Sequence, residues 1–433
     1  MKGKETPGER GETSSGHRIA VIGGGVSGIV AAWLLQKEHQ VTLFEANTYL
    51  GGHTHTVVLR DGPDAGTPVD TGFIVLNDRT YPEFRKFLAA LEISTRNTAM
   101  SFSFYDQVKG LVYSGSGLNG LFTQRRNIAR PSFWRMLIGM MHFFGESKEA
   151  LAKNTVPDVP LGEYLEGRYP RETIDDYILP MASSIWSASP REMDSFPALS
   201  FLRFFHNHGL LGISGRPQWM TVAGGSHSYV RAFENSFPGD IRLGDPVQGI
   251  GRNDAGVRII TRKGEALDFD KVVIAVHADD ALKLLDEPSP DEKRLLAPWR
   301  YQPNNTVLHS DTSALPPARR AWSCWNYCRE HSDDGNFPVS VCYSMNLLQG
   351  LKTARHYCVS LNRQTPLRED SVIARMIYRH PLYTFESVRT QEELPGLNGR
   401  LNTWFCGSYF GYGFHEDAVK SANQVGRDFG STL

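Results

Sequence analysis

Three glycines with the spacing G-x-G-x-x-G stand near the start of the chain, at Gly23, Gly25 and Gly28. They follow the apolar run 18–22 and precede a stretch with helical character that reaches Lys37. In a strand–loop–helix unit the first glycine permits a tight turn, the second lets a pyrophosphate approach the backbone, and the third lets helix and strand pack closely. Free N–H groups at the helix start then attract phosphate.

A second short strand is expected at 41–44, and Glu45 ends it. A carboxylate at that point can accept hydrogen bonds from the hydroxyls of a bound ribose. Strand, glycine loop, helix, second strand and terminal acid occur in the order of a dinucleotide-binding unit, which is a much more specific signal than the glycines alone. These elements favour nucleotide binding over a glycine-rich turn that binds nothing.

The segment after this unit carries a resemblance to a known family. Residues 49–56, YLGGHTHT, resemble the G-G-R-x-x-T stretch of the flavin amine oxidase and phytoene desaturase superfamily, and 70–73, DTGF, resemble the D-x-G segment that follows there. The resemblance implies FAD, bound non-covalently, with Gly51 and Gly52 beside its diphosphate. His53 stands where the family has arginine; a histidine can donate to phosphate, but its charge depends on pH.

Later segments resemble the remaining parts of the superfamily's FAD-binding domain. Residues 222–225 resemble its G-G return, Val247 stands where the family has a valine against the adenine, and 403–418 resemble its C-terminal signature. In the family a helix N-terminus there faces the flavin pyrimidine ring and stabilises the anionic reduced flavin. The predicted cofactor-binding residues are Gly23, Gly25, Ser27, Gly28, Glu45, Gly51, Gly52, His53, Thr54, Gly72, Val247, Gly407, Phe414, His415 and Ala418.

The same resemblance implies the fold class and the domain organisation. We expect an α/β protein of amine-oxidase type, in which a discontinuous Rossmann-like FAD-binding domain holds an inserted, mixed α+β substrate domain. The predicted boundaries are 1–17 for a disordered tail, 18–77, 221–285 and 396–433 for the FAD-binding domain, and 78–220 and 286–395 for the substrate domain. The first substrate segment has an apolar, helical pattern, and the second is rich in strand patterns.

Composition excludes several classes of partner. The 46 Lys and Arg residues nearly equal the 47 Asp and Glu residues, so no nucleic-acid partner is expected. Five cysteines without a C-x-x-C pair predict free thiols in a reducing compartment, and no ligand spacing indicates a metal. Residues 1–17 lack the apolar core of a signal peptide, and no apolar run is long enough for a bilayer span. We therefore expect a cytoplasmic protein.

Two departures weigh against amine oxidation. Amine oxidases of the superfamily generally carry a lysine near the flavin N5, whereas the matching stretch 301–309 has none, and only Tyr409 and Tyr412 are candidates for the usual aromatic cage. The pattern is closest to a bacterial subgroup of FAD-binding proteins with segments such as 50–56 and 411–417. That subgroup is associated with cyclopropane-fatty-acyl synthesis, which implies an acyl substrate, as a small molecule or lipid, and a cyclopropane-fatty-acyl-synthase-like methyltransferase as functional partner.

The leading hypothesis is an FAD-dependent oxidoreductase that desaturates or isomerises a methyl-branched or unsaturated fatty-acyl chain by hydride transfer to flavin N5. His208, Tyr412 and His415 are the candidate catalytic residues that handle the proton. Two alternatives stay open: an amine or amino-acid oxidase, and a flavin-binding partner of a lipid-modifying enzyme that performs no turnover. His208 could equally cap a turn, and Trp186 fits packing better than catalysis.

The helical segment 133–144 is rich in aromatic residues and methionines. It could line an acyl tunnel or touch a membrane surface, although such residues at helical spacing more often form ordinary core. Peripheral membrane contact would give access to phospholipid acyl chains, but the net charge of −1 gives it no support.

Overall fold

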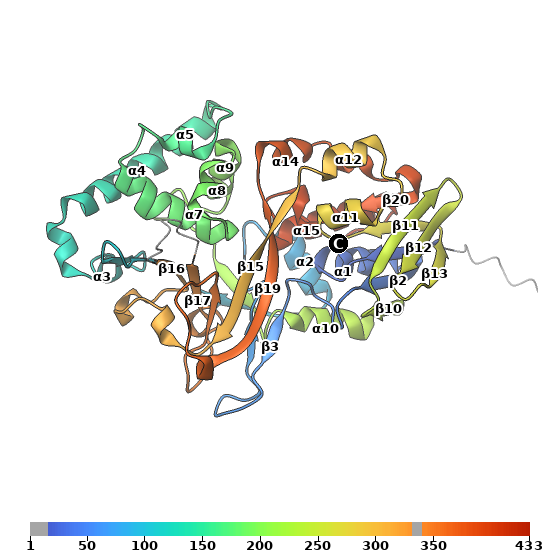
Figure 1. The fold of residues 1–433 in the computed structure, drawn as a ribbon, viewed down its shortest axis with the longest axis horizontal. Coiled ribbons are helices and arrows are strands. Elements are labelled where there is room, and N and C mark those ends of the chain that lie inside the picture. The colour runs from blue at the N-terminus through green and yellow to red at the C-terminus, as the bar shows by residue number, and fades with distance from the viewer. Residues whose placement is uncertain (1–15, 331–339) are drawn as a thin grey trace, which may run out of the picture.

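The computed structural model describes residues 16–330 and 340–433. The predicted tail 1–17 therefore lies outside the described residues, except for its last two positions. Figure 1 shows an elongated molecule with a parallel sheet toward one end, a group of helices at the other end, and two long strands between them.

The parallel sheet has five strands in the order β10-β2-β1-β14-β20. Its strands are β1 (Arg18–Ile22), β2 (Gln40–Glu45), β10 (Asp240–Leu243), β14 (Lys271–Ile274) and β20 (Thr403–Phe405). Alternate side chains enter different cores: Ile19 and Val21 belong to one, and Ala20 and Ile22 to the other. Burial on both faces explains why these strands read as continuous apolar runs.

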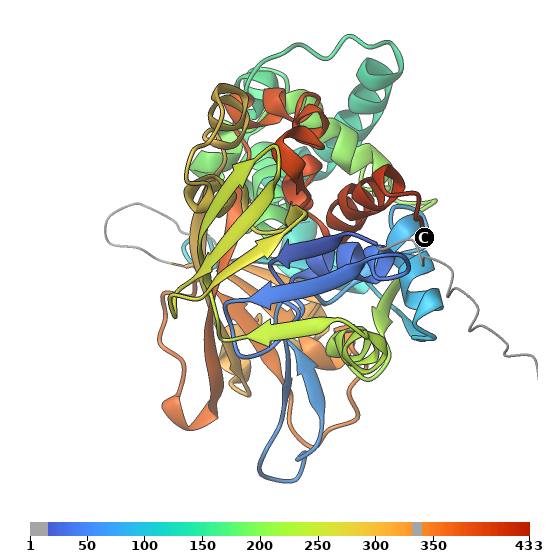
Figure 2. The same cartoon turned by 90° about the vertical axis from the view of Figure 1, so that its right-hand side faces the viewer.

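Helices cover one face of this sheet, and a small antiparallel sheet covers the other. The helices are α1 (Val26–Leu35), α2 (Pro82–Ala90), α10 (His227–Ser236) and α15 (His415–Asp428). The antiparallel sheet consists of β11 (Val247–Asn253), β12 (Gly256–Thr261) and β13 (Ala266–Phe269), with α11 (Ala278–Leu284) and α12 (Pro290–Leu296) nearby. Figure 2 shows this antiparallel sheet and α15 on either side of the parallel strands. The helix expected to reach Lys37 ends at Leu35.

A second sheet of seven strands has the order β19-β15-β18-β17-β16-β7-β8. Its strands are β7 (Phe102–Asp106), β8 (Leu111–Ser114), β15 (Arg300–His309), β16 (Trp325–Arg329), β17 (Ser340–Ser344), β18 (Cys358–Leu361) and β19 (Val372–Leu382). All its pairs are antiparallel except β16 with β7. The long pair β15–β19 runs through the middle of Figure 1 and joins the two halves.

The far end of the molecule is helical. It contains α3 (Leu118–Leu121), α4 (Pro131–Ala152), α5 (Leu161–Leu165), α6 (Arg171–Thr173), α7 (Leu179–Trp186), α8 (Pro190–Asp194) and α9 (Ala198–Asn207). The smaller elements are β3 (Thr56–Val58), β4 (Pro68–Asp70), β5 (Leu76–Asn77), β6 (Thr95–Thr98), β9 (Trp219–Val222), α13 (Met345–Leu348) and α14 (Phe385–Thr390). Among the described residues, no helix combines the length and apolar character that a membrane span requires.

The predicted domain boundaries stay a prediction. α2 lies within the range assigned to the substrate domain, yet it packs against α15, and its Phe84 and Phe87 share a core with α1. The segment 133–144 divides between core and surface: Phe133 is buried in α4, whereas Trp134 is exposed.

Candidate functional site

The two glycine motifs, separate in the sequence, form one surface. The Gly51 N–H donates to the carbonyl oxygen of Gly24 at 2.8 Å, and Gly25 and Gly51 form a parallel bridge. A Cβ on Gly52 would lie 3.2 Å from the Cα of Gly25. Gly51 and Gly52 have φ angles of 120° and 57°, which favour glycine. The close approach of the two loops therefore depends on residues without side chains.

The three glycines of the first motif have distinct surroundings. A Cβ on Gly28 would lie 1.8 Å from the Gly23 carbonyl oxygen and 3.3 Å from the Ala275 Cβ, so Gly28 allows α1 to pack against the sheet. A Cβ on Gly25 would have no atom of the described residues within 4 Å. Open space therefore lies directly at the start of α1, where backbone N–H groups can receive a phosphate.

The Glu45 carboxylate is fixed at the end of β2. One oxygen accepts from the Gly24 N–H at 2.7 Å, and the other accepts from the backbone and side-chain nitrogens of Asn47, each at 2.8 Å. These bonds orient the carboxylate beside the glycine loop. It keeps acceptor capacity for ribose hydroxyls, which is the role that the sequence predicts.

The second glycine motif also meets the start of α15. The Thr54 Oγ1 lies 2.9 Å from the Nε2 of His415 and 2.5 Å from the Tyr229 hydroxyl, and the His415 ring stacks on Phe73 at 3.7 Å. Burial lowers the pKa of His415 to about 3, with a smaller contribution from His53.

The other predicted cofactor residues surround the same region. Ser27 and Ala418 are buried on α1 and α15, and these two helices pack together. Gly407, which follows the end of β20, donates its N–H to the hydroxyl of Ser421 on α15. A Cβ on Gly72 would lie 2.1 Å from the His53 carbonyl oxygen. The predicted residue Val247 is half-buried at the start of β11, and Phe414 immediately precedes α15.

Three histidines from different elements form a cluster that the sequence did not reveal. The His53 ring lies 5.8 Å from that of His277, 5.4 Å from that of His380 and 5.3 Å from that of Tyr378. Burial lowers the pKa of His277 to about 4 and of His380 to about 3, and also lowers that of His53. All three imidazoles are therefore neutral near pH 7.

The Nε2 of His53 is buried, and no group in the described part of the chain bonds to it. An unbonded buried nitrogen is costly, so its presence indicates a ligand partner. This orphaned nitrogen and the open space at Gly25 fit a bound dinucleotide. The residues that would hold FAD are those of the two glycine loops, Glu45, His53 and the start of α15.

Comparison with known proteins agrees with this site. The family model of flavin-containing amine oxidoreductases matches residues 26–327. The chain belongs to this family. Membership confirms the predicted superfamily and fold class, and it agrees with FAD as cofactor and with oxidoreductase chemistry.

Individual relatives are distant. The protein named flavin-containing monoamine oxidase AofH of Mycobacterium tuberculosis is 25% identical over 288 residues, which cover 64% of this chain and 61% of the relative. The chain thus spans about three fifths of the length of the curated relatives it matches.

Solved structures show the fold over nearly the whole chain. A CLA-producing fatty acid isomerase from P. acnes has a TM-score of 0.67 and 16% identity, covering 96% of this chain and 100% of that one. Cyclohexylamine oxidase from Brevibacterium oxydans has a TM-score of 0.69 and 15% identity, with the same shares covered.

Of the histidines in this cluster, His277 could have been noticed from the sequence, whereas His380 could not. His277 follows β14 at the carboxyl edge of the parallel sheet, where ligands bind in open α/β folds, so its position could have been noticed. His380 lies within β19, and no local pattern marks it. Its place depends on the pairing of β19 with β15, where the Asn304 Nδ2 donates to the His380 Nδ1 at 2.8 Å.

His277 also lies near two carboxylates. His277, Asp279 and Asp280 each offer a ligand atom within 4.8 Å of the others. Arg379 forms ion pairs with both carboxylates, at 2.6 Å for Asp280. Because this arginine already balances their charge, we assign no metal to the group.

Two of the three predicted catalytic residues share a cavity. His208 and Tyr412 line a volume of about 450 Å³ together with Asp417, whereas the His415 ring is held against Phe73 instead. The His208 Nδ1 bonds the Phe204 carbonyl oxygen at 3.0 Å; because a carbonyl can only accept, Nδ1 carries the proton and Nε2 keeps its lone pair. Burial lowers the pKa of His208 to about 4.

The family's aromatic cage does not form from the two candidate tyrosines. Tyr409 is buried against Trp299 and Phe410, whereas Tyr412 is partly exposed and lines the cavity. The two rings therefore lie in different parts of the structure and do not face each other as a cage requires.

Proposed function

We propose that the protein is an FAD-dependent oxidoreductase that acts on a long apolar substrate, desaturating or isomerising a methyl-branched or unsaturated fatty-acyl chain. An aromatic wall beside the start of α15 carries the proposal. Trp186 of α7 lies 4.7 Å from Phe204 of α9, and Phe204 stacks on Phe414 at 5.0 Å, measured between ring centroids. Trp186 and Phe204 are buried behind Phe414, and Phe414 lines the cavity, so this wall offers apolar surface to a substrate through Phe414.

The cavity next to this wall has an amphiphilic lining. Phe414 and His208 belong to it, and the exposed Arg79 and Lys420 also line it. The same lining holds the carboxyl groups of Glu416 and Asp417, and Lys420 pairs with Glu416 at 3.5 Å. The Phe414 ring can contact an acyl chain, and Arg79 can bind a carboxylate or phosphate at its end.

Two observations disfavour amine oxidation. β15 contains no lysine, and Tyr409 and Tyr412 do not form a cage. The runner-up, an amine or amino-acid oxidase, is supported by the family and by the names of several relatives. One solved neighbour is named a fatty acid isomerase, which supports an acyl substrate by fold alone.

FAD, when bound, supplies a hydride acceptor. Desaturation also removes a proton from the neighbouring carbon, whereas isomerisation returns the hydride to the other end of an allylic unit without net proton loss. A base works best with a pKa near the working pH. Burial raises the pKa of Asp417 to about 6, whereas that of His208 is about 4. Among the groups of the cavity, Asp417 is therefore our preferred proton acceptor, with His208 and Tyr412 beside it.

The experiment is anaerobic absorbance of the purified holoprotein, with unsaturated or methyl-branched phospholipid in one arm and a panel of amines in the other. Bleaching of the oxidised flavin band by lipid alone supports net acyl oxidation. Bleaching by an amine overturns the acyl assignment. An unchanged flavin band together with unchanged lipid would favour the third candidate, a flavin-binding partner without turnover.

A variant pair separates the aromatic wall from general packing. Phe204→Leu is expected to raise KM for the acyl substrate with little change in FAD content, because Phe204 faces His208 and Phe414. The matched control is Phe205→Leu on the same helix, since Phe205 packs against Phe143 and Phe201 in the core. If the two substitutions change KM equally, the aromatic wall no longer supports an apolar acyl substrate.

We also propose a methyltransferase of the cyclopropane-fatty-acyl-synthase type as functional partner. Such an enzyme places a one-carbon group on an unsaturated acyl chain, so its product is a chain of the class proposed as substrate. Conversion of that methyltransferase's lipid product, compared with the unmodified lipid, tests the assignment. Conversion of the unmodified lipid alone would contradict it.

A further inference from the structure

A row of apolar side chains is exposed at the helical end of the molecule. On α4, Trp134, Ile138 and Met141 are 43%, 55% and 48% exposed, and their spacing places them on one stripe of the helix. Ile128, 53% exposed, precedes α4, and Leu118, 76% exposed, begins α3. We call these five residues the α4 face. Large apolar side chains gathered on one exposed surface indicate an interaction site.

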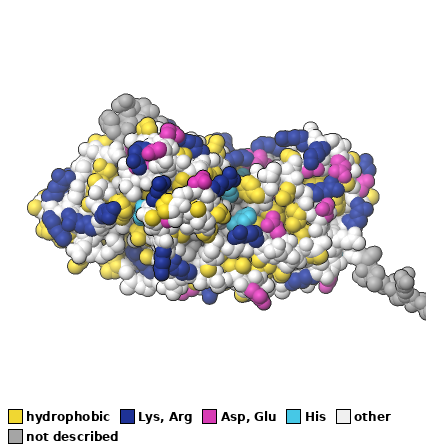
Figure 3. All heavy atoms as spheres, turned by 90° about the horizontal axis from the view of Figure 1, so that it is seen from below, with side chains coloured by type: hydrophobic (Ala, Val, Ile, Leu, Met, Phe, Trp, Pro, Cys, Tyr) yellow, Lys and Arg dark blue, Asp and Glu magenta, His cyan; other side chains and the backbone are white. Residues whose placement is uncertain are grey.

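The charge of the surrounding segment is one-sided. Residues 107–145 contain no Asp or Glu, although the whole chain has a net charge of −1. The Lys and Arg residues of this segment are Lys109, Arg125, Arg126, Arg130 and Arg135. In Figure 3, Lys and Arg side chains lie among hydrophobic ones at the end where Figure 1 places α3 and α4.

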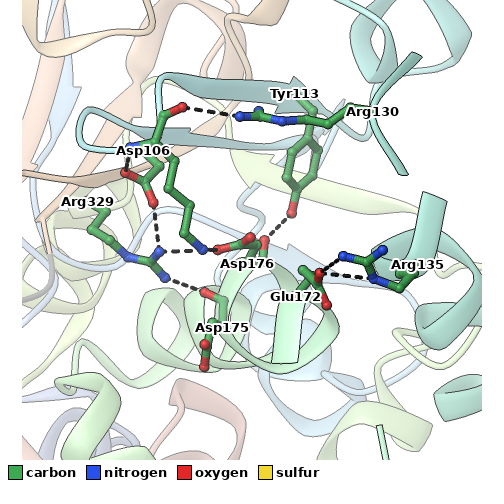
Figure 4. Close-up of polar contacts among 9 residues, drawn as sticks. Asp106, Tyr113, Arg130, Arg135, Glu172, Asp175, Asp176 and Arg329 are labelled. Carbon is green, nitrogen blue, oxygen red and sulfur yellow. Dashed lines mark hydrogen bonds and ion pairs between the residues drawn. The ribbon is translucent and has the colours of Figure 1, made fainter. Parts of the chain in front are cut away.

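Two of these five cations are already paired. Lys109 bonds Asp176 at 2.7 Å, and Arg135 pairs with Glu172. Figure 4 shows Arg135 directed to Glu172, and it shows the Arg130 guanidinium directed to a backbone carbonyl oxygen, which is that of Lys109. These bonds connect the segment to residues 172–176.

The other three cations bond only to neutral groups among the described residues, and one of these groups is the side-chain amide oxygen of Asn119, which accepts from Arg125 at 3.2 Å. Arg125 donates to the carbonyl oxygen of Phe122 at 3.2 Å, and Arg126 donates to that of Gly110 at 2.6 Å. In residues 16–330 and 340–433, no carboxylate forms an ion pair with Arg125, Arg126 or Arg130. Arg130 is partly buried and lines a cavity with Glu172, Asp175 and Asp176, whereas Arg125 and Arg126 are exposed. Two exposed positive charges without a carboxylate partner thus lie beside the α4 face.

We propose that the α4 face docks the protein on an anionic lipid bilayer. Exposed Trp, Ile and Met side chains enter the interfacial region of a bilayer, while neighbouring arginines bind the phosphates of acidic lipids. α4 also buries Phe133 and Met136 in the protein core, so the helix lies on the surface and does not enter the bilayer as a separate segment. This inference goes beyond the proposed reaction, because it depends on neither FAD nor the identity of the substrate.

Vesicle co-sedimentation of the holoprotein tests the charge. The probe is vesicles of pure phosphatidylcholine, compared with an equal mixture of phosphatidylcholine and phosphatidylglycerol. Binding to the anionic vesicles only is expected. Arg125→Ser/Arg126→Ser should weaken it about 30-fold, as two charges near an acidic surface would give. The charge-matched control is Arg262→Ser/Lys263→Ser in the exposed β12–β13 turn, which should bind like the unaltered protein.

A fluorescent label tests the apolar contact independently of binding strength. All five native cysteines are buried, so a cysteine introduced by Ile138→Cys can be labelled selectively with an environment-sensitive dye. Its emission should shift to the blue on addition of anionic vesicles, whereas the dye on Ile373→Cys, an exposed position of β19, should not respond.

Three results would overturn the proposal. The first is equal binding to neutral and anionic vesicles, and the second is unchanged dye emission at position 138 when the protein is bound to vesicles. The third is a change of oligomeric state in Ile138→Glu measured without lipid, which would show that the α4 face is a contact between copies of the chain.

Discussion

Replacement of Gly25 by alanine separates cofactor binding from folding. The backbone of Gly25 has φ −72° and ψ 178°, which alanine adopts freely, and the new methyl group would meet no atom of the described residues within 4 Å. The free energy of unfolding of the FAD-free protein should therefore change by less than about 1 kcal/mol, since alanine also reduces the entropy of the unfolded chain.

FAD affinity should respond very differently. The methyl group would project into the open space at the start of α1, where a phosphate would contact backbone N–H groups. A hydrogen bond to a charged group contributes about 1.5–3 kcal/mol, so loss of two such bonds costs about 3–6 kcal/mol. The dissociation constant for FAD should rise about 100-fold or more, because each 1.4 kcal/mol is about a factor of ten.

The assay is a titration of FAD-free protein with FAD, followed by flavin fluorescence, together with urea unfolding. Gly28→Ala is the contrasting variant: its methyl group would lie 1.8 Å from the Gly23 carbonyl oxygen, so it should destabilise the FAD-free protein itself. Gly145→Ala is the neutral control, because it too has no atom within 4 Å but lies on α4. Unchanged FAD affinity in Gly25→Ala would refute the assignment of the glycine loop.

Three further predictions concern stability and thiol chemistry. Arg252 and Glu292 form an ion pair with side chains only 2% and 6% exposed. Arg252→Met should lower the free energy of unfolding, measured in urea, by about 3–5 kcal/mol, and the double variant Arg252→Met/Glu292→Met should recover much of this loss. Equal losses in the single and double variants would contradict a buried pair. His208 has its pKa lowered to about 4 by burial; the unfolded chain therefore binds a proton that the folded protein does not, and stability should fall by about 2 kcal/mol from pH 7 to pH 5 through this residue. His208→Asn should lose that part of the pH dependence, and an unchanged slope would show that His208 is not held neutral. All five cysteines are buried, so a thiol reagent should label none in the native protein and all five after unfolding; rapid native labelling would contradict their burial.

The glycine loop could be predicted because its determinants are local. Gly23 and Gly28 are required by contacts within one strand–loop–helix unit, and Glu45 ends the next strand of the same unit. The resemblance then supplied the second loop and the start of α15. The bonds that join them, such as that between Thr54 and His415, link segments far apart in the sequence.

The histidine cluster and the α4 face show what a sequence pattern leaves undetermined. His380 reaches His53 only because β15 and β19 pair between the two halves of the molecule. Along α4, the helical period predicts a helix but not which apolar residues find a partner. Phe133 contacts Tyr113 in the core, whereas Ile138 remains exposed. Both outcomes depend on tertiary contacts.

The most direct test of the central claim is a single anaerobic turnover of the holoprotein with an unsaturated or methyl-branched phospholipid, followed by mass spectrometry of the released acyl chains. We expect either a chain that has lost two hydrogens, with a reduced flavin, or a chain of unchanged mass with a shifted double bond. Acyl chains unchanged in mass and in double-bond position, with the flavin reduced by an amine in the parallel reaction, would contradict it.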